Sequence, residues 1–498
     1  MLAIIVAILA VVVAALYLKQ QIEGARRSSD MRSTGTPPQE SFHLPPGPVP
    51  KDKKIGNVDE IAARGNLNEY IADLHKEYGP VVKFYYGKTL VVSTYKPEHL
   101  RQQAHLFDRD ATFFAFLEPI VGNRGVGWFN GEKGHRLRGA IDPYFTDAAS
   151  KRYLSHLYDA SERLAREWRR RLGDESQMDA EGYVLIADLL HELKSFALEC
   201  TSRLTLGDYF RDKKKRDRLE FLMDLMMSEA QARMADPSVQ MSEECAKASV
   251  ETRRLVEEAV AARSREVQDG TSQMEGRLVV DELLDVCDDA DELFSNAIGV
   301  FIGAFETSSI WTSRLFHYIF GGNGASEQVQ EKVYRELVEV LGGTTAELEA
   351  HHIDKLTYCK AVMDESLRLG GIVGMTQRVP SEPLQIGDYT VPAGTWLLHD
   401  LESAAKNDEA FPNPDVFNPD RFLVDNPPPP LACPRFGFAG GRLCPGKAFA
   451  FYEAYSLLAA LIRQFEFKVD QSAVEVGKHY QLLIPPASNL AVRIRARS

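Results

Sequence analysis

The strongest constraint on the fold of this chain is a helix-patterned stretch that runs from about Tyr153 to Arg378. Apolar residues recur in it at the spacing of amphipathic helices, and polar interruptions near residues 211–217, 235–242, 269–277 and 321–325 separate one helix from the next. A helical period does not fit a sheet. With 44% hydrophobic and 26% charged residues, the composition is that of an ordinary globular protein. We therefore predict a packed, mainly helical body.

Strand-like segments are few and short. Residues 81–86 and 89–92 are rich in β-branched and aromatic residues and flank a Gly-Lys turn, which predicts a hairpin. Residues 384–391, followed by 392–395, predict a second one. No repeat or linker divides the body. The predicted fold class is mainly α with a small β-rich part, in a single large domain over residues 51–498.

The N-terminus predicts a membrane anchor. Leu2 to Leu18 is an uncharged apolar run of 17 residues, about 25 Å long as a helix, close to the ~30 Å of a hydrocarbon core. Basic residues follow this run and none precedes it, which favours a cytoplasmic body. The alternative is a cleaved signal peptide, but its basic n-region is missing. We assign residues 1–18 to a transmembrane anchor and 19–50 to a polar stalk with a proline-rich hinge.

Charge and cysteine content exclude several classes of function. Lys and Arg total 58 against 71 Asp and Glu, so the net charge of -13 argues against nucleic acid as a partner. The six cysteines have no paired spacing, which is typical neither of a disulfide framework nor of a zinc module. We expect a reducing compartment.

One cysteine has a distinctive setting. Cys444 follows a glycine-dense loop that starts at Arg435 and precedes a predicted helix over 447–465. Backbone N–H groups at a helix N-terminus stabilise a thiolate, and the glycines allow these groups to approach the sulfur. Arg442 adds positive charge. A buried structural thiol or a redox cysteine remains an alternative for this loop taken alone.

An acid and an alcohol interrupt a second segment. Glu306 and Thr307 follow an apolar, small-residue-rich helix over 293–305. A carboxylate there is costly unless it has a function, and a threonine can deliver a proton to a flat ligand held against the small residues. The alternative is an acid on a solvated face beside a threonine that bonds its own helix.

A third constellation is the pair Glu365 and Arg368, one helical turn apart, with Arg421 in a later proline-rich loop. Alone, the pair is typical of a surface ion pair. With Arg421 it forms a candidate three-member network.

These segments, taken together and in this order, resemble the cytochrome P-450 superfamily and its fold. The resemblance implies haem b as the cofactor, with Cys444 as its axial thiolate, a ligand that favours O–O cleavage. The other implied site residues are Arg442, Arg138 and Arg378 as propionate partners, Gly440 and Gly446 as loop glycines, Phe438 against the haem, Glu306 and Thr307 in oxygen activation, and Glu365, Arg368 and Arg421 as a structural network.

The chain departs from the superfamily pattern at three places. Gly437 stands where an aromatic is expected seven residues before the cysteine, so either Phe436 or Phe438 covers the proximal haem face. Gly134 replaces a tryptophan four residues before Arg138, and His135 is a candidate replacement for its propionate contact. Gly303-Ala304 replaces the more common Ala-Gly.

Several segments, among them residues 55–58, 67–70 and 78–82, are most similar to the animal family 20 of this superfamily. The resemblance implies a haem-thiolate monooxygenase that takes electrons from NADPH through a flavoprotein reductase and oxidises a small apolar substrate. It also implies a single-pass protein of the endoplasmic reticulum membrane. The alternatives are a reductase-independent isomerase or dehydratase, which the Glu306-Thr307 pair disfavours, and a haem-based sensor.

Overall fold

The computed structural model describes residues 42–235, 239–272, 274, 276–320, 328–423, 427–438, 440–469 and 490–497. The predicted anchor, most of the predicted stalk and the predicted interruption at 321–325 lie outside these residues. Within them the fold is mainly helical with small sheets, as the sequence predicts.

The helices are α2 (Val58–Arg64), α3 (Leu67–Tyr78), α4 (Pro97–Gln102), α5 (Glu118–Val121), α6 (Gly131–Ile141), α7 (Asp147–Leu172), α8 (Leu189–Leu206), α9 (Lys213–Ala235), α10 (Glu243–Gln268), α11 (Val279–Val286), α12 (Ala290–Phe301), α13 (Thr307–Ile319), α14 (Gln328–Leu341), α15 (Ala350–Ile353), α16 (Thr357–Leu369), α17 (Leu401–Ala405) and α18 (Lys447–Leu457). The strands are β1 (Val81–Tyr86), β2 (Thr89–Thr94), β3 (Val184–Ile186), β4 (Met375–Arg378), β5 (Leu384–Ile386), β6 (Tyr389–Val391), β7 (Trp396–Asp400), β8 (Phe465–Val469) and β9 (Val492–Ala496).

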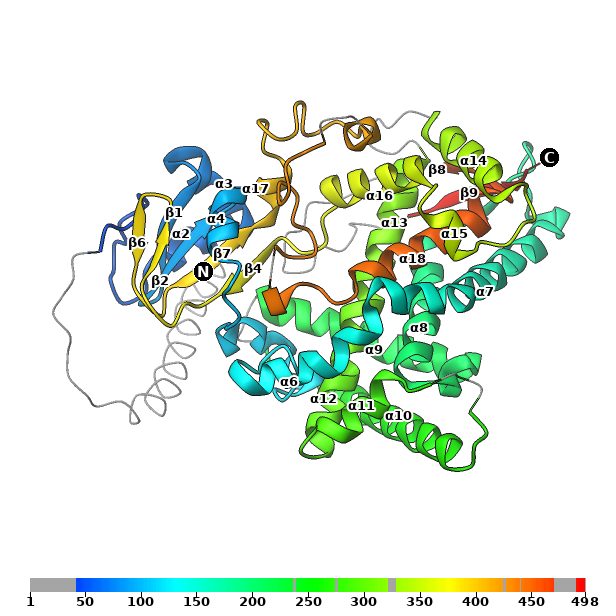
Figure 1. Cartoon of the computed structure of the whole chain (residues 1–498), viewed down its shortest axis with the longest axis horizontal. Helices are drawn as coiled ribbons and strands as arrows, with labels where there is room; N and C mark the ends of the chain where they lie inside the picture. The colour runs from blue at the N-terminus through cyan, green and yellow to red at the C-terminus, as the bar shows by residue number, and fades with distance from the viewer. Residues whose placement is uncertain are drawn as a thin grey trace, which may run out of the picture.

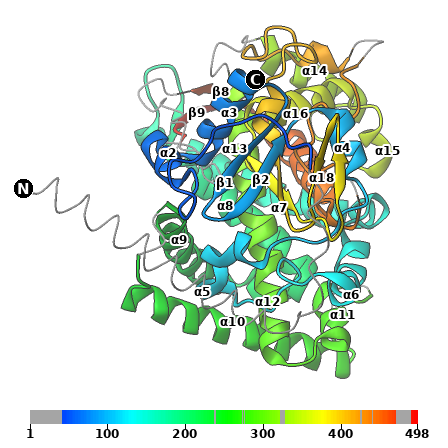
Figure 2. The same cartoon turned by 90° about the vertical axis from the view of Figure 1, so that its left-hand side faces the viewer.

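The β-rich part, which consists of the four-stranded sheet and the β5–β6 hairpin, lies at one side of the molecule (Figure 1), the side that faces the viewer in Figure 2. The long helices and the small β3-β9-β8 sheet form the other side. The four-stranded sheet has the strand order β1-β2-β7-β4, in which the β2–β7 pair is parallel and the others are antiparallel. Both predicted hairpins are present. In the second one, β5–β6, the chain turns at Gly387-Asp388, where Gly387 has φ +57°, and not at residues 392–395.

The helical body is built around a long central helix that a π-helical turn divides. α12 ends at Phe301, residues Ile302–Glu306 form the π turn, and α13 continues from Thr307. This is the one helix among the described residues that is long and apolar enough to span a membrane, but 67% of its most apolar window is buried inside the protein. It is therefore a core helix, packed against α8 and α16. Single π turns of this kind are often found at functional sites.

Two sequence expectations are corrected at the edges of the helices. The helix after the cysteine loop ends in a π turn, Leu458–Ile462, and Phe465 begins β8, which pairs with β9. The stretch 153–378 also contains β3, which pairs with the other edge of β9. In a short apolar run, the spacing of the residues does not distinguish a strand from a helix. Whether the run forms a strand depends on a partner strand that is distant in sequence.

A buried carboxyl in α18 generates a prediction about pH. Glu453 is fully buried, and desolvation raises its pKa to about 8, opposed by the Ser308 hydroxyl. The folded state therefore keeps a proton that the unfolded chain loses above pH ~4.5, so stability falls as the pH rises, by ~1.4 kcal/mol per pH unit up to pH ~8. Glu453→Gln should remove this loss. We expect a higher melting temperature than wild type at pH 7.5 and a much smaller difference at pH 5. The exposed Glu243→Gln is the control, and a pH-independent difference would contradict the buried neutral acid.

Candidate active site

The cysteine loop folds tightly in front of α18. The backbone N–H of Cys444 donates to the Phe436 carbonyl at 2.9 Å. Gly440 has φ +69°, and a Cβ there would lie 2.6 Å from the Ala104 carbonyl oxygen, so a side chain is excluded. A Cβ at Gly446 would lie 3.9 Å from the Cys444 sulfur, in ordinary contact. Residue 440 must therefore be glycine, because the backbone leaves no room for a side chain. Glycine at position 446 leaves the space around the Cys444 sulfur open.

The surroundings of the Cys444 thiol have two opposing effects on its pKa. Desolvation raises its pKa, and the backbone N–H groups of Gly446 and Lys447 oppose this. Cys444 keeps exposed surface, unlike the buried Cys200, Cys245 and Cys359, but enough atoms enclose it for desolvation to dominate. The N–H groups expected at the helix N-terminus are present, yet they do not make the free thiol acidic. A metal cation bound to the sulfur would supply the missing stabilisation of the thiolate.

One face of the central helix is lined by small accessible residues. Between Phe294 and Phe320 the residues with remaining accessible surface are Gly299, Val300, Gly303, Ala304 and Thr307. A Cβ at Gly299 or Gly303 would meet no atom within 4 Å, so the helix faces open space there. The cysteine loop lies beside this helix, because the ring of Phe436 is 6.4 Å from that of Trp311 in α13 (Figure 1). The small residues of this face are therefore the part of the central helix that a flat ligand beside the cysteine loop would contact.

The acid and the alcohol of the π turn point in different directions. Thr307 Oγ1 donates to the Gly303 carbonyl at 2.6 Å on the accessible face, the helix-bonded state that the alternative interpretation expected. Glu306 is buried, contrary to that interpretation, and its Oε2 lies 3.4 Å from Nζ of Lys194 in α8. Burial raises the pKa of Glu306, and Lys194 opposes the shift.

Four arginines form a cationic cluster: Arg109, Arg138, Arg378 and Arg442. Desolvation and the neighbouring guanidinium groups lower the pKa of Arg378 and of Arg442 to about 10, and that of Arg109 well below its usual value. Nη2 of Arg378 and Nε of Arg109 are buried without a hydrogen-bond partner. Buried cations that lower one another's pKa need an anion. The cluster therefore fits a ligand with carboxylates, such as the two propionates of haem.

The four arginines of this cluster have different hydrogen-bond partners. Arg442 donates to the carbonyls of Phe107, Val126 and Phe129, so it fixes the chain around residues 107–130. Arg138 donates to the Leu443 carbonyl and pairs with Asp142, and so holds the cysteine loop. Arg378 and Arg109 keep donors free for a ligand. Arg109 was not predicted, because it lies in a polar loop with no motif around it.

Gly134 is explained by close packing. A Cβ there would lie 2.4 Å from the Phe129 carbonyl oxygen and 2.8 Å from the Phe107 ring. Phe107 itself lies between the Arg442 guanidinium, 3.9 Å from its centroid, and the His135 ring at 3.8 Å. His135 thus packs on Phe107.

The two phenylalanines around Gly437 point to different neighbours. The Phe436 ring contacts Trp311 and the Phe451 ring of α18, in the core. The Phe438 ring is 5.1 Å from the Arg378 guanidinium and 4.3 Å from the His399 ring. Phe438 is therefore on the side of the arginine cluster, and Phe436 lies between the loop and the central helix.

The Glu365 network is buried. Arg368 binds both carboxylate oxygens of Glu365, at 2.7 and 2.8 Å, and Arg421 Nε lies 3.1 Å from Glu365 Oε1. The side chains of Glu365 and Arg368 have no exposed surface, so the pair is not a surface ion pair. Arg435, which sequence analysis did not single out, donates to the Arg368 carbonyl at 2.6 Å and to Glu402. This contact connects the network to the start of the cysteine loop.

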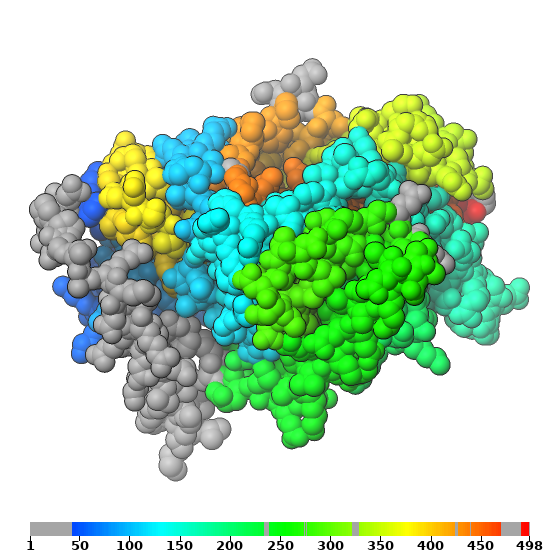
Figure 3. All heavy atoms as spheres, turned by 60° about the horizontal axis from the view of Figure 1, so that its bottom comes forward, coloured from blue at the N-terminus to red at the C-terminus, as the bar shows by residue number. Residues whose placement is uncertain are grey.

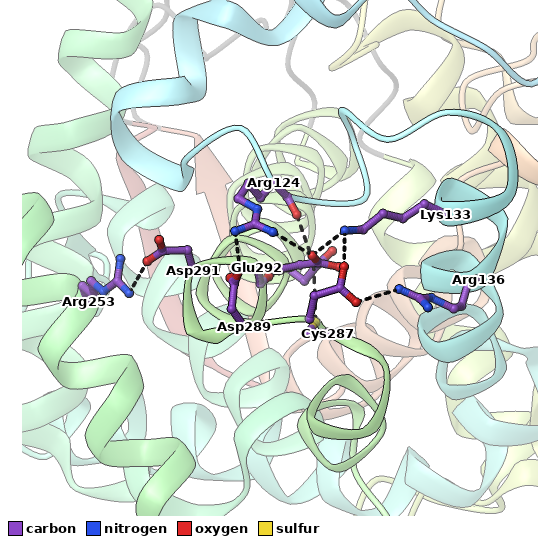
Figure 4. A network of polar contacts seen from close by, with 10 residues as sticks. Arg124, Lys133, Arg136, Arg253, Cys287, Asp289, Asp291 and Glu292 are labelled. Carbon is purple, nitrogen blue, oxygen red and sulfur yellow. Dashed lines mark hydrogen bonds and ion pairs between the residues drawn. The ribbon is translucent and has the colours of Figure 1, made fainter.

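A second ionic network holds the segment before α6 on the first turn of α12 (Figure 4). The fully buried Glu292 side chain accepts from Lys133 at 2.6 Å and lies 3.5 Å from Arg124. Asn296 Oδ1 accepts from the Val126 N–H at 2.8 Å. α6 also packs against α11, and the two helices are neighbours in the space-filling view (Figure 3). The segment 122–130 is thus fixed to the central helix by Glu292 and to the cysteine loop by Arg442.

Comparison with known proteins identifies the family of this chain. The sequence profile described as Cytochrome P-450 matches residues 45–491. The chain is 26% identical to cytochrome P-450 20A1 of Mus musculus, over 86% of this chain and 89% of that protein, and 24% identical to the Homo sapiens protein of the same name, over 84% and 86%. It is also 24% identical to cytochrome P-450 4c21 of Blattella germanica, over 86% and 88%.

The fold and the comparisons define a haem-thiolate oxygenase. The chain belongs to the cytochrome P-450 family. It is a cytochrome P-450 monooxygenase, and its cofactor is haem b held through a cysteine thiolate. The similarity to family 20 that the sequence indicated is supported.

The buried network makes a prediction about folding. Glu365→Ala leaves Arg368 and Arg421 without their carboxylate, and removing one partner of a buried ion pair costs ~3–5 kcal/mol. We expect little haem-loaded protein and a melting temperature lowered by several degrees, measured by absorbance and calorimetry. Glu243→Ala, which removes an exposed ion pair with Lys247 in α10, is the matched control. A normal haem content in Glu365→Ala would show that the network is dispensable.

Proposed function

We propose that this monooxygenase inserts one oxygen atom from O2 into a small apolar organic substrate, using two electrons that NADPH supplies through a flavoprotein reductase. The observation that carries this proposal is the accessible face of small residues, with Thr307 at its end, beside the cysteine loop. An isomerase that rearranges a peroxide needs no such pair of acid and alcohol.

The residues divide into those that hold the cofactor and those that serve the reaction. We propose Cys444 as the axial ligand, and Arg378 and Arg109 as propionate partners, with Arg442, Arg138 and the glycines shaping their surroundings. Haem, when bound, supplies the activation of O2. Glu365, Arg368 and Arg421 keep the proposed role of a structural network.

Thr307 is proposed to move protons. Its hydroxyl lies on the accessible face, where its oxygen can accept a proton. Its own hydroxyl proton, donated to the Gly303 carbonyl in the structure, must leave that carbonyl to be passed onward. Glu306 is proposed to supply that proton, because burial raises its pKa above that of a solvated carboxyl and so favours its protonated form. The small residues leave space for an apolar substrate beside the hydroxyl.

We further propose a single-pass anchor at residues 1–18, with the catalytic domain on the cytoplasmic side of the endoplasmic reticulum, supported by the apolar run and the basic residues after it. Digestion of the body by protease added to intact microsomes is the expected result. Protection until detergent is added would reverse the orientation.

The axial ligand is tested by Cys444→Ser. The variant should lose the thiolate-type absorption of the reduced, CO-bound protein, because sulfur is the electron-donating ligand. Cys433→Ala is a stringent control: Cys433 lies in the approach to the same loop, and burial raises its pKa to about 11. That control should keep the wild-type spectrum. A thiolate spectrum in Cys444→Ser would reject the assignment.

The proton-delivering role is tested by Thr307→Ala. With NADPH, a reductase, O2 and a substrate found by screening apolar compounds, the variant should keep its haem spectrum while electrons pass to hydrogen peroxide. Proton assistance is typically worth ~100- to 10,000-fold, so product per NADPH should fall sharply. Unchanged coupling would remove Thr307 from the mechanism. If the wild type consumes no NADPH with any reductase, the isomerase or sensor alternative is favoured instead.

A further inference from the structure

A buried histidine lies next to the arginine cluster. His399 in β7 is fully buried, and its ring is 4.3 Å from the Phe438 ring, which in turn lies 5.1 Å from the Arg378 guanidinium. β7 pairs with β4, the strand that ends in Arg378 (Figure 1). The fold therefore places a titratable ring beside the anion site, and the proposed function does not use it.

Both ring nitrogens of His399 face a hydrogen-bond acceptor. Nδ1 is 3.2 Å from the Thr376 carbonyl oxygen, which can only accept. Nε2 is 2.7 Å from Oε1 of Gln103. The Gln103 amide is oriented by its own Nε2, which donates to the His99 carbonyl at 3.1 Å, so the amide oxygen is the atom that faces the ring. A neutral imidazole has one N–H group and serves only one of these acceptors, whereas an imidazolium serves both.

The charged groups around the ring oppose that imidazolium. Burial and the guanidinium groups of Arg378 and Arg109 lower the pKa of His399 well below its usual value, while the hydrogen bond to the Thr376 carbonyl raises it. Asp400, the next residue of β7, has its carboxylate at the first turn of α17, where it accepts two backbone N–H groups. As long as the two guanidinium charges are uncompensated, the ring is neutral and one of its two acceptors has no donor.

Two carboxylates held by Arg378 and Arg109 would cancel the two charges that act against the imidazolium. Nη2 of Arg378 and Nε of Arg109 are buried donors without a partner among the described residues, and they are available to such carboxylates. After this cancellation, burial alone opposes a proton on His399, and two hydrogen bonds favour it. The 2.7 Å separation from Gln103 is within the range of charge-assisted N–H···O bonds.

We propose that His399 is a positioning residue of the cofactor site, which takes up one proton from water when the carboxylates of haem bind to Arg378 and Arg109. The ring becomes an imidazolium, and its two N–H groups then hold β4 on one side and the Gln103 side chain on the other. The Phe438 ring, which lies near both cations, is fixed with them. This inference rests on the proposed role of Arg378 and Arg109 as propionate partners.

The first experiment follows the release of haem from the holoenzyme to excess apomyoglobin between pH 6 and 9. Because the haem-bound protein holds one more proton than the haem-free protein, haem binding weakens as the pH rises, by up to about 10-fold per pH unit. Haem loss from the wild type should therefore accelerate with pH relative to His399→Gln, which cannot gain the proton. Any effect of Glu453 on stability is common to both proteins and cancels in this ratio.

His351→Gln, at an exposed histidine of α15, is the matched control and should release haem as the wild type does. Equal pH profiles of the wild type and His399→Gln would overturn the proposal.

The second experiment detects the proton directly. In the reduced, CO-bound holoenzyme labelled with 13C-histidine, the ring signal of His399 should have the chemical shift of an imidazolium at pH 7, where a free histidine is mostly neutral. The signal is assigned by its absence in His399→Gln. If that variant retains little haem, the signal is assigned by its displacement in Gln103→Met, which removes one of the two acceptors. A neutral ring at pH 7 would overturn the proposal.

Arg109→Gln separates a failure of this inference from a failure of the propionate assignment. The variant should release haem faster than the wild type at every pH, because it removes a cation from the carboxylates. Faster release, together with equal pH profiles of the wild type and His399→Gln, would overturn the role of His399 and leave the propionate partners in place. Unchanged release would refute the propionate role of Arg109, and the inference with it. Neither experiment needs turnover, so the proposed oxygenase reaction is tested independently.

Discussion

The arrangement of the cysteine loop depends on one buried carboxylate. Glu365 accepts hydrogen bonds from two guanidinium groups and from the backbone N–H of Asn418, so its charge is balanced without water. Arg368, held by this carboxylate, binds the carbonyls of Ala405 and Pro414, and its own carbonyl accepts from Arg435. The segment that leads to the cysteine loop has little regular structure. Its course is fixed because its carbonyls accept hydrogen bonds from the guanidinium groups of this network.

The arginine cluster is organised by the opposite principle, since its charges are not balanced by the protein. A chain with net charge -13 collects four arginines in one cluster and gives two of them buried donors without a partner. Such an arrangement opposes folding by itself and is relieved by an anionic ligand, so cofactor binding and stability are coupled. The other two members of the cluster, Arg442 and Arg138, hold residues 107–130 and the cysteine loop, so the scaffold and the anion site are direct neighbours.

Sequence reasoning predicted the local features well and the long-range ones poorly. Glycines at 440 and 446, the Glu365–Arg368 spacing and the Thr307 position are visible as short patterns, because each depends on neighbours along the chain. Arg109, Arg435 and Lys194 have no such pattern, since their roles depend on elements that are distant in sequence. The reason for a glycine at position 134 also could not be predicted, because it is the close approach of the Phe107 ring and the Phe129 carbonyl. The end of the helix after the cysteine loop depended likewise on a partner strand at the C-terminus.

The central helix directs two adjacent residues to different sides of its axis. Neighbouring side chains of a helix are ~100° apart and do not face each other, so an acid and an alcohol in sequence have different surroundings. The extra residue of a π turn widens the helix locally and frees a carbonyl. Here Gly303 provides the carbonyl that holds Thr307, while Glu306 is buried toward α8. The acid thereby gains a raised pKa from burial, and the alcohol, one residue further along the chain, stays on the accessible face of the helix.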